Sequence, residues 1–191
     1  MIGGLTVIPK KRYYCKVMLE SSGGERQKSG SGHESPAELS VKGPFYAGGL
    51  RFSCQRCSAC CRFESGYVYL SRQDVSLLRT ALDMPYDKFI EKYCRWVPEW
   101  NGKSRLSLKE KRNYDCIFWS KEHGEGCRVY KERPLQCRTF PFWPSIMESK
   151  DNWEMTAQDC PGTGEGELHS RDSIEKMLAK RRMEPIIFRD I

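Results

Sequence analysis

The sequence predicts a small, irregular, metal-stabilised α+β domain with short strands, a helix pair and a C-terminal helix. Two observations lead to this prediction. Cysteine is too frequent for an ordinary intracellular core, with ten cysteines in 191 residues. Short strand-like and helix-like patterns follow one another between residues 66 and 183. A chain of this length accommodates one domain with appendages, or at most two small domains.

Residues 1–44 are predicted to form a flexible, basic, Ser/Gly-rich extension, and residues 45–191 to form a cysteine-cluster metal-binding domain. The first segment has few apolar residues between its Ser- and Gly-rich runs, which are typical of linkers. Its Cys15 and His33 are expected to be incidental rather than ligands. Its start lacks the long apolar run of a signal peptide.

The predicted domain continues, after a cluster of cysteines, with a short strand and two helices. Gly66–Leu70 is rich in β-branched and aromatic residues, as short strands are. Ser71 is the expected N-cap of a helix over Arg72–Leu82, and Asp74 completes a capping box. Pro85 can open a second helix that ends near Trp96 and contains Cys94, which we interpret as a packing residue.

Two further elements are predicted from periodicity. Arg105–Lys109 alternates polar and apolar residues, as a half-buried strand does. Ser170 is the expected cap of a terminal helix over Arg171–Met183, whose basic last turn opposes the helix dipole favourably. That basic turn therefore needs no nucleic acid to explain it.

The first chemical motif is Cys54-Gln-Arg-Cys57-Ser-Ala-Cys60-Cys61. Thiols two residues apart in a CxxC step can converge on one ion through a tight turn. Consecutive side chains tend to diverge, so Cys60 and Cys61 indicate two separate centres or one bridged centre. Buried thiols or disulfides are the alternatives. Metal or iron–sulfur ligation is favoured because the chain shows no export signal, and unexported cysteines stay reduced.

The second chemical motif extends from Cys116 to Cys160. Gly124 and Gly126 allow the backbone to turn so that Cys116 and Cys127 approach each other. Arg133-Pro134 should open a turn or short helical bend that presents Cys137. Cys160-Pro161 resembles the step that closes some ferredoxin motifs. His123 is a possible ligand, but the thiols already suffice without it.

The formal net charge of +7 permits an anionic partner without requiring one. Several arginines lie next to cysteines, where they would offset the negative charge of bound thiolates. These are Arg56, Arg62, Arg128 and Arg138. No nucleic-acid-binding motif is present, so we do not expect a nucleic-acid partner. No segment has the apolar length of a membrane span, and we expect a cytoplasmic location with metal ions as partners.

The order and flanks of these cysteines resemble the YkgJ-type cysteine-cluster family, whose CxxCxxCC domain is described as zinc- or iron-chelating. The resemblance covers about residues 50–166 and rests on Phe52-x-Cys54-x-x-Cys57-x-x-Cys60-Cys61, Cys116-x-Phe118, Gly126-Cys127-x-Val-Tyr130, Arg133-Pro134-x-x-Cys137-Arg138-x-Phe140-Pro141 and Cys160-Pro161-Gly162. It implies a metal-ligand set that leaves out Cys15 and Cys94. The implied ligands are Cys54, Cys57, Cys60, Cys61, Cys116, Cys127, Cys137 and Cys160.

The expected function is that of a zinc- or iron(-sulfur)-binding protein, with a metal site that is structural, redox-active or used in metal handling. Eight thiolates could form two closed zinc sites, or a [4Fe-4S] cluster with zinc or a second cluster. The alternative is an enzyme of the oxidoreductase or protein-modifying type, because flagellin lysine N-methylases carry a similar cysteine cluster. A weaker alternative is a thiol nucleophile at Cys61, whose pKa Arg62 could lower. We expect the domain to lose ordered structure when its metal is stripped.

Overall fold

The fold is α+β, as predicted: helices and short antiparallel strands follow one another along a computed structural model that describes residues 43–122 and 126–190. The helical elements are the single turn η1 (Ala59–Cys61) and helices α2 (Arg72–Ala81), α3 (Tyr86–Tyr93), α4 (Leu135–Thr139), α5 (Pro144–Met147), α6 (Lys150–Asp159) and α7 (Arg171–Met183). The strands are β1 (Leu50–Phe52), β2 (Cys94–Pro98), β3 (Lys103–Leu108), β4 (Trp119–Ser120), β5 (Gly126–Cys127), β6 (Thr163–His169) and β7 (Phe188–Asp190).

The predicted extension lies almost entirely outside the described residues, together with Cys15, His33 and His123. The proposed domain boundary near residue 45 therefore stays a prediction. None of the helices in the described part of the chain is both long enough and apolar enough to cross a membrane.

A first core forms where α2 and α3 pack on the antiparallel pair β2–β3. The predicted capping box opens α2, because the Ser71 hydroxyl accepts the Asp74 N–H at 3.0 Å and the Asp74 carboxylate accepts the Ser71 N–H at 3.0 Å. The predicted strand over Arg105–Lys109 is confirmed as β3. Leu78 and Phe89, both fully buried, join the two helices to this core.

The predicted second helix is wrong in its last turn. Helix α3 ends at Tyr93, and Cys94 starts strand β2 instead of lying within the helix. The residues after it favour a strand: Trp96 and Val97 pair with β3, and Pro98 lacks the N–H that a continuing helix needs. Cys94 is buried in the first core, as its interpretation as a packing residue requires, and burial raises the pKa of its thiol to about 12.

The predicted strand over Gly66–Leu70 is wrong as a regular strand, although the segment runs beside β3. The Val68 carbonyl accepts the Leu108 N–H and the Leu70 N–H donates to the Leu106 carbonyl, each at 3.0 Å. Within residues 43–122 and 126–190, no strand pairs with its other side. The Gln136 amide of α4 takes that place, accepting the Tyr69 N–H at 3.0 Å and donating to the Tyr67 carbonyl at 2.8 Å.

A second core is formed by α5, α6 and α7 together with β1, which pairs with β6. The rings of Phe142 and Trp153 stack with their centroids 5.8 Å apart, and Ile174 of α7 is fully buried. The predicted terminal helix is confirmed over Arg171–Met183, with the Ser170 hydroxyl accepting the Ser173 N–H. Helix α6 and strand β6 were not predicted.

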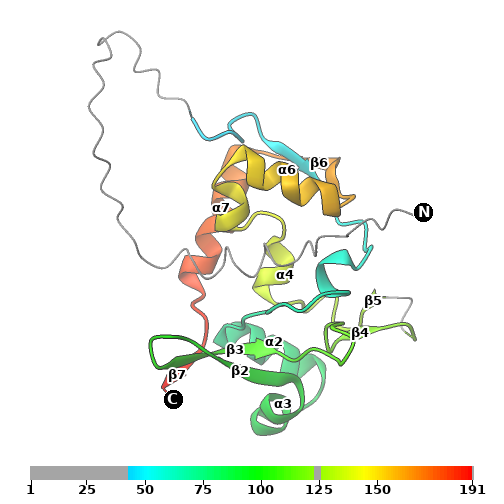
Figure 1. Cartoon of the computed structure of the whole chain (residues 1–191), viewed down its shortest axis with the longest axis vertical. Coiled ribbons are helices and arrows are strands. Elements are labelled where there is room, and N and C mark those ends of the chain that lie inside the picture. Colours follow the sequence, from blue (N-terminus) through cyan, green and yellow to red (C-terminus); the bar gives the residue numbers. More distant parts are fainter. Residues whose placement is uncertain (1–42, 123–125, 191) are drawn as a thin grey trace, which may run out of the picture.

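The two cores meet at α4, which lies between them in Figure 1. The buried Asp74 carboxylate accepts the Leu135 N–H at 2.7 Å, so one side chain both caps α2 and holds the first residue of α4. The chain after α7 returns to the first core, where β7 pairs with β3. The two cores are therefore joined by chain segments that pass from one core to the other and by polar contacts to α4.

Replacing Asp74 with alanine should lower the free energy of unfolding by about 3 kcal/mol, because the Ser71 and Leu135 N–H groups would lose their buried acceptor. Denaturant unfolding of the full chain measures this. The control is Asp87→Ala, which removes an exposed carboxylate from the first turn of α3 and should cost less than about 1 kcal/mol. Equal losses in the two variants would contradict the role assigned to Asp74.

Candidate metal centre

The eight predicted ligands lie on separate segments that surround the junction of the two cores. Cys116 and Cys127 pack against the first core, and Phe52, just before the first cysteine motif, packs against the second. Helix α4, between the cores, carries Cys137. None of the nine cysteines in the described residues forms a disulfide.

The segment from Cys54 to Cys61 is tightly coiled. Arg56 and Ser58 have left-handed backbones, with φ of 52° and 63°, and η1 follows directly. Non-glycine residues adopt this conformation at a cost, and it persists where the surroundings determine it. The Arg56 guanidinium stacks over the Tyr130 ring at 4.2 Å, which anchors the coil. Cys54, Cys57 and Cys60 are exposed, whereas Cys61 is half-buried.

A pair of adjacent contacts joins the end of this segment to Cys116. The Cys116 N–H donates to the Cys61 carbonyl at 2.8 Å. Beside it, the Arg62 Nε donates to the Asp115 carboxylate at 3.1 Å. Burial alone would raise the pKa of Asp115, but hydrogen bonds from Arg62 and Asn113, with the positive charges of Arg62 and Lys111, hold it below its usual value. The Asp115 carboxylate is therefore charged and forms an ion pair with Arg62.

Trp119 extends this connection to Cys127. The Arg62 guanidinium lies 3.6 Å from the centre of the Trp119 ring, and the indole N–H donates to the Ser58 hydroxyl at 3.1 Å. In the β4–β5 pair, Trp119 stands opposite Cys127. This pairing and the Cys116–Cys61 hydrogen bond connect the segments that carry Cys116 and Cys127 to the Cys54–Cys61 segment.

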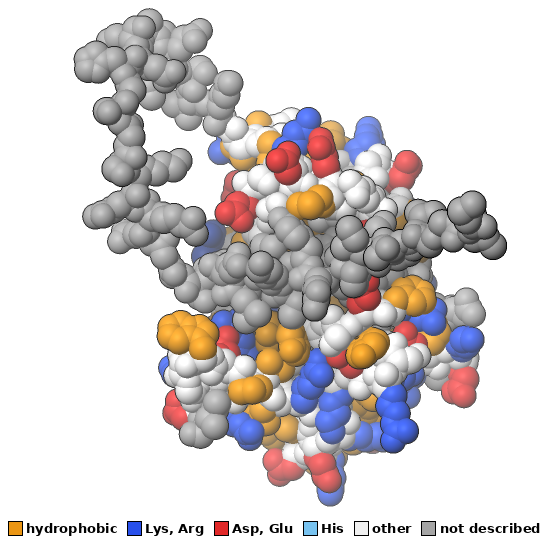
Figure 2. Space-filling model, in the orientation of Figure 1, with side chains coloured by type: hydrophobic (Ala, Val, Ile, Leu, Met, Phe, Trp, Pro, Cys, Tyr) orange, Lys and Arg blue, Asp and Glu red, His pale blue; other side chains and the backbone are white. Residues whose placement is uncertain are grey.

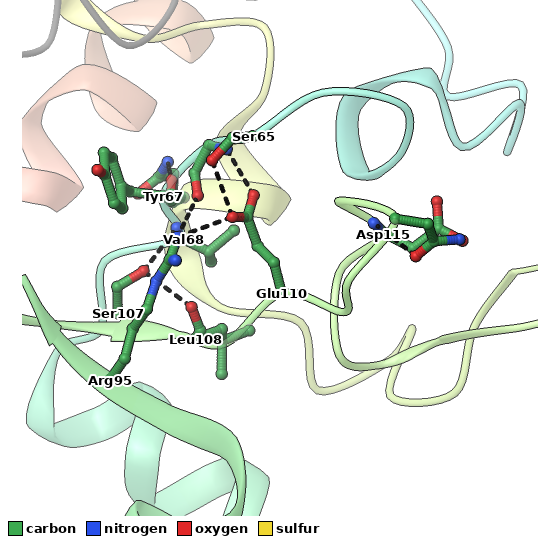
Figure 3. Close-up of polar contacts among 11 residues, drawn as sticks. Ser65, Tyr67, Val68, Arg95, Ser107, Leu108, Glu110 and Asp115 are labelled. Atoms are coloured by element: carbon green, nitrogen blue, oxygen red, sulfur yellow. Dashed lines mark hydrogen bonds and ion pairs between the residues drawn. The ribbon is translucent and has the colours of Figure 1, made fainter.

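Glu110 fixes the chain that leaves the cysteine motif (Figure 3). Its carboxylate accepts from the Ser65 hydroxyl at 2.9 Å, from the Gly66 N–H at 2.5 Å and from Arg95 at 2.9 Å. Residue 110 also forms an isolated antiparallel bridge with Cys116. Glu110 therefore contacts both the chain that follows the first cysteine motif and the segment that carries Cys116.

Two glycines allow the chain near Cys160 to pack closely against the residue that precedes the first cysteine motif. The Ser53 N–H donates to the Gly162 carbonyl at 3.1 Å, where β1 meets the start of β6. A Cβ on Gly162 would collide with the Ser53 carbonyl oxygen, and one on Gly166 would collide with the Ser53 side chain. These glycines permit close backbone contact, and this places Cys160 beside the residue that precedes Cys54.

The thiols act on one another electrostatically in two sets that share Cys60. Burial raises the pKa of Cys116 to about 11 and that of Cys137 well above its usual value. Negative charge on Cys60 or Cys127 would raise both pKa values further. Burial likewise raises the pKa of Cys160, and negative charge on Cys57 or Cys60 adds to it.

Backbone N–H groups oppose these increases at three of the thiols. Cys116, Cys127 and Cys160 each receive a hydrogen bond from the residue two positions ahead, namely Phe118, Val129 and Gly162, and each bond lowers the thiol pKa. Donors aimed at sulfur favour the thiolate, which is the form that binds metal. The same local turn therefore recurs on three separate segments.

The donor set fits a thiophilic cation such as zinc or iron, because soft thiolates are its preferred ligands. No three Cys, His, Asp or Glu side chains within residues 43–122 and 126–190 converge closely enough to form a complete metal site. The structure therefore provides the approach of the thiol-bearing segments and not a closed coordination sphere. His169 contacts the Phe52 carbonyl at 3.1 Å through its Nε2.

Several residues around the thiols could not be selected from the sequence pattern. Arg133 stacks over the Tyr130 ring at 3.6 Å. Burial raises the pKa of both Cys127 and Cys137, and the positive charge of Arg133 opposes part of this increase. Arg133 belongs to the Arg133-Pro134 motif, and this was the only feature of the sequence that pointed to it. Arg138, which was selected, instead donates to the Arg133 carbonyl and lies 3.7 Å from the Asp74 carboxylate.

Comparison with known proteins identifies a family model that matches residues 53–161, described as "CxxCxxCC: Putative zinc- or iron-chelating domain". The uncharacterized protein MJ0661 of Methanocaldococcus jannaschii is 28% identical over 110 residues. That match covers 58% of this chain and 55% of the relative, so the chain spans about half the length of this curated relative. No solved structure matches significantly.

Gly162→Ala should disturb the approach of Cys160 to the first cysteine motif, because the added methyl group collides with backbone and not with a flexible side chain. We expect a loss of about 1–3 kcal/mol in stability, as for other overpacked sites, and a lower metal content. Gly48→Ala is the control, since nothing lies within 4 Å of its added Cβ. Thermal melting and the metal-to-protein ratio of both variants provide the measurement. A Gly162→Ala protein that matches Gly48→Ala in both would show that the contact is dispensable.

Proposed function

This chain belongs to the CxxCxxCC family, and from that premise we propose that it binds zinc or iron through eight cysteines. The proposed ligands are Cys54, Cys57, Cys60, Cys61, Cys116, Cys127, Cys137 and Cys160. The observation that carries the proposal is the recurrent turn in which a backbone N–H points at the sulfur two residues before it, at Cys116, Cys127 and Cys160. Backbone N–H groups aimed at sulfur favour the thiolate form, which is the form that binds metal.

We propose that the thiols divide into an inner and an outer group. The inner group consists of Cys60, Cys116, Cys127 and Cys137, whose charges affect one another. The outer group includes Cys57 and Cys160, which are coupled in the same way, and Cys54, which follows the Ser53–Gly162 contact. Cys61 joins the two groups, because its carbonyl accepts the Cys116 N–H while its neighbour Cys60 interacts with both.

The proposed role of the metal is structural in the first place. Zinc binding to structural sites contributes roughly 10–16 kcal/mol, whereas a whole domain is stable by about 5–15 kcal/mol. Binding between two small cores is therefore strong enough to decide whether they stay together. When bound, the metal would neutralise thiolate charge, and an iron–sulfur cluster in the same place would add electron transfer. A metal-handling role uses the same ligands.

The cofactor is proposed to be zinc or a [4Fe-4S] cluster, in a reducing, cytoplasmic setting. Thiolates remain available to metal where disulfides do not persist. The buried thiols hold their protons until a cation displaces them, so metal binding should release protons.

Cys137→Ala should lose metal whereas Cys94→Ala should keep it. Both substitutions remove a thiol, but Cys94 is surrounded by the first core, whereas Cys137 interacts with three other thiols. Elemental analysis of anaerobically purified protein gives the metal content, and visible absorption near roughly 400 nm distinguishes an iron–sulfur cluster from colourless zinc. Full metal content in Cys137→Ala, or equal losses in both variants, would contradict the ligand assignment.

A further inference from the structure

A basic hollow lies beside the candidate metal centre but uses none of its thiols. It has a volume of about 510 Å³ and is formed by the end of α3, the chain between β3 and β4, strand β4 with the two residues after it, and the residue that follows β5. Its lining includes four cations and one carboxylate, namely Lys92, Lys111, Lys121, Arg128 and Glu122. Figure 2 shows Lys and Arg side chains, with some acidic ones among them, in the lower part of this face of the molecule.

None of the four cations forms an ion pair within the described part of the chain, although the charge of Lys111 also acts on the Asp115 carboxylate. The Lys111 ammonium donates to the Trp119 carbonyl at 2.5 Å, which holds it at the wall of the hollow. Lys92 lies 5.3 Å from the Tyr93 ring centre, Lys111 lies 5.8 Å from that of Trp119 and Arg128 lies 5.9 Å from that of Phe118. Aromatic rings therefore stabilise three of the four charges.

We propose that this hollow binds a small anion that carries several phosphate or carboxylate groups. Like charges gathered on one surface repel each other, and a multivalent anion removes this repulsion. The volume lies within the range of about 300–1,000 Å³ that is usual for small-molecule sites. The lining holds four cations and a single carboxylate, on Glu122, which favours a ligand with more than one negative group.

The hollow shares a wall with the thiol segments. Ile117 and Arg128, which line the hollow, directly follow Cys116 and Cys127 in the chain. Binding itself depends only on the cations, so it can succeed or fail independently of the proposed metal function.

The test uses a fluorescent pyrene trisulfonate as the probe, because sulfonates are multivalent anions that bind zinc and iron poorly. The full chain, as purified with its metal, is titrated at low salt. Inorganic phosphate and succinate then compete for the probe, which distinguishes phosphate from carboxylate recognition. Metal content is measured after each titration, so that stripping of the metal is not mistaken for binding.

The decisive comparison is between two double variants with the same change in net charge. Lys92→Gln/Lys121→Gln removes exposed cations of the hollow, and Lys103→Gln/Lys176→Gln removes exposed cations elsewhere. Lys111 is left intact because it bonds to backbone. We expect the first pair to weaken probe binding about tenfold and the second less than about twofold. Equal weakening in the two variants, or no saturable binding by the unaltered chain, would overturn the proposal.

Discussion

Burial of neighbouring thiols is the constraint on which the proposed metal site depends. Cys60 interacts with thiols from both cores, and each thiolate formed there would make the next one harder to form. Arginines and backbone N–H groups offset part of this cost, but burial still keeps the thiol pKa values above their usual range. A divalent cation or an iron–sulfur cluster would supply the missing positive charge. In the proposed account, the junction between the cores is complete only with metal.

The surrounding residues act on the backbone beside the thiols and leave the sulfurs available. Hydrogen bonds of Asp74 and Gln136 fix the position of α4. The Arg62–Asp115 pair lies beside the contact between Cys61 and Cys116, and Gly162 leaves room for the Ser53 backbone. Contacts of this kind position the thiols without using their sulfur atoms. In metal sites, the loss of such contacts commonly lowers the affinity for the metal roughly 10–100-fold. The two cores are small, so their relative placement depends on these contacts together with the proposed metal.

Local signals in the sequence predicted much of the fold, because they act within one turn of the chain. The Ser71–Asp74 capping box and the Ser170 cap located α2 and α7 correctly. Contacts between distant residues were not predictable in this way. Pairing with β3 turned the expected last turn of α3 into β2, and the Gln136 side chain took the place of a strand beside Tyr69. The motif spacing identified candidate thiols, but it gave no sign that Asp115 or Trp119 would join their segments.

X-ray absorption at the metal edge of the anaerobically purified full chain tests the central claim most directly. The account predicts a first shell dominated by sulfur, with about four sulfurs per metal at roughly 2.3 Å for zinc, or the sulfur and iron neighbours of a cluster. A first shell of oxygen and nitrogen, or a chain that is fully folded and contains no tightly bound metal, would contradict it.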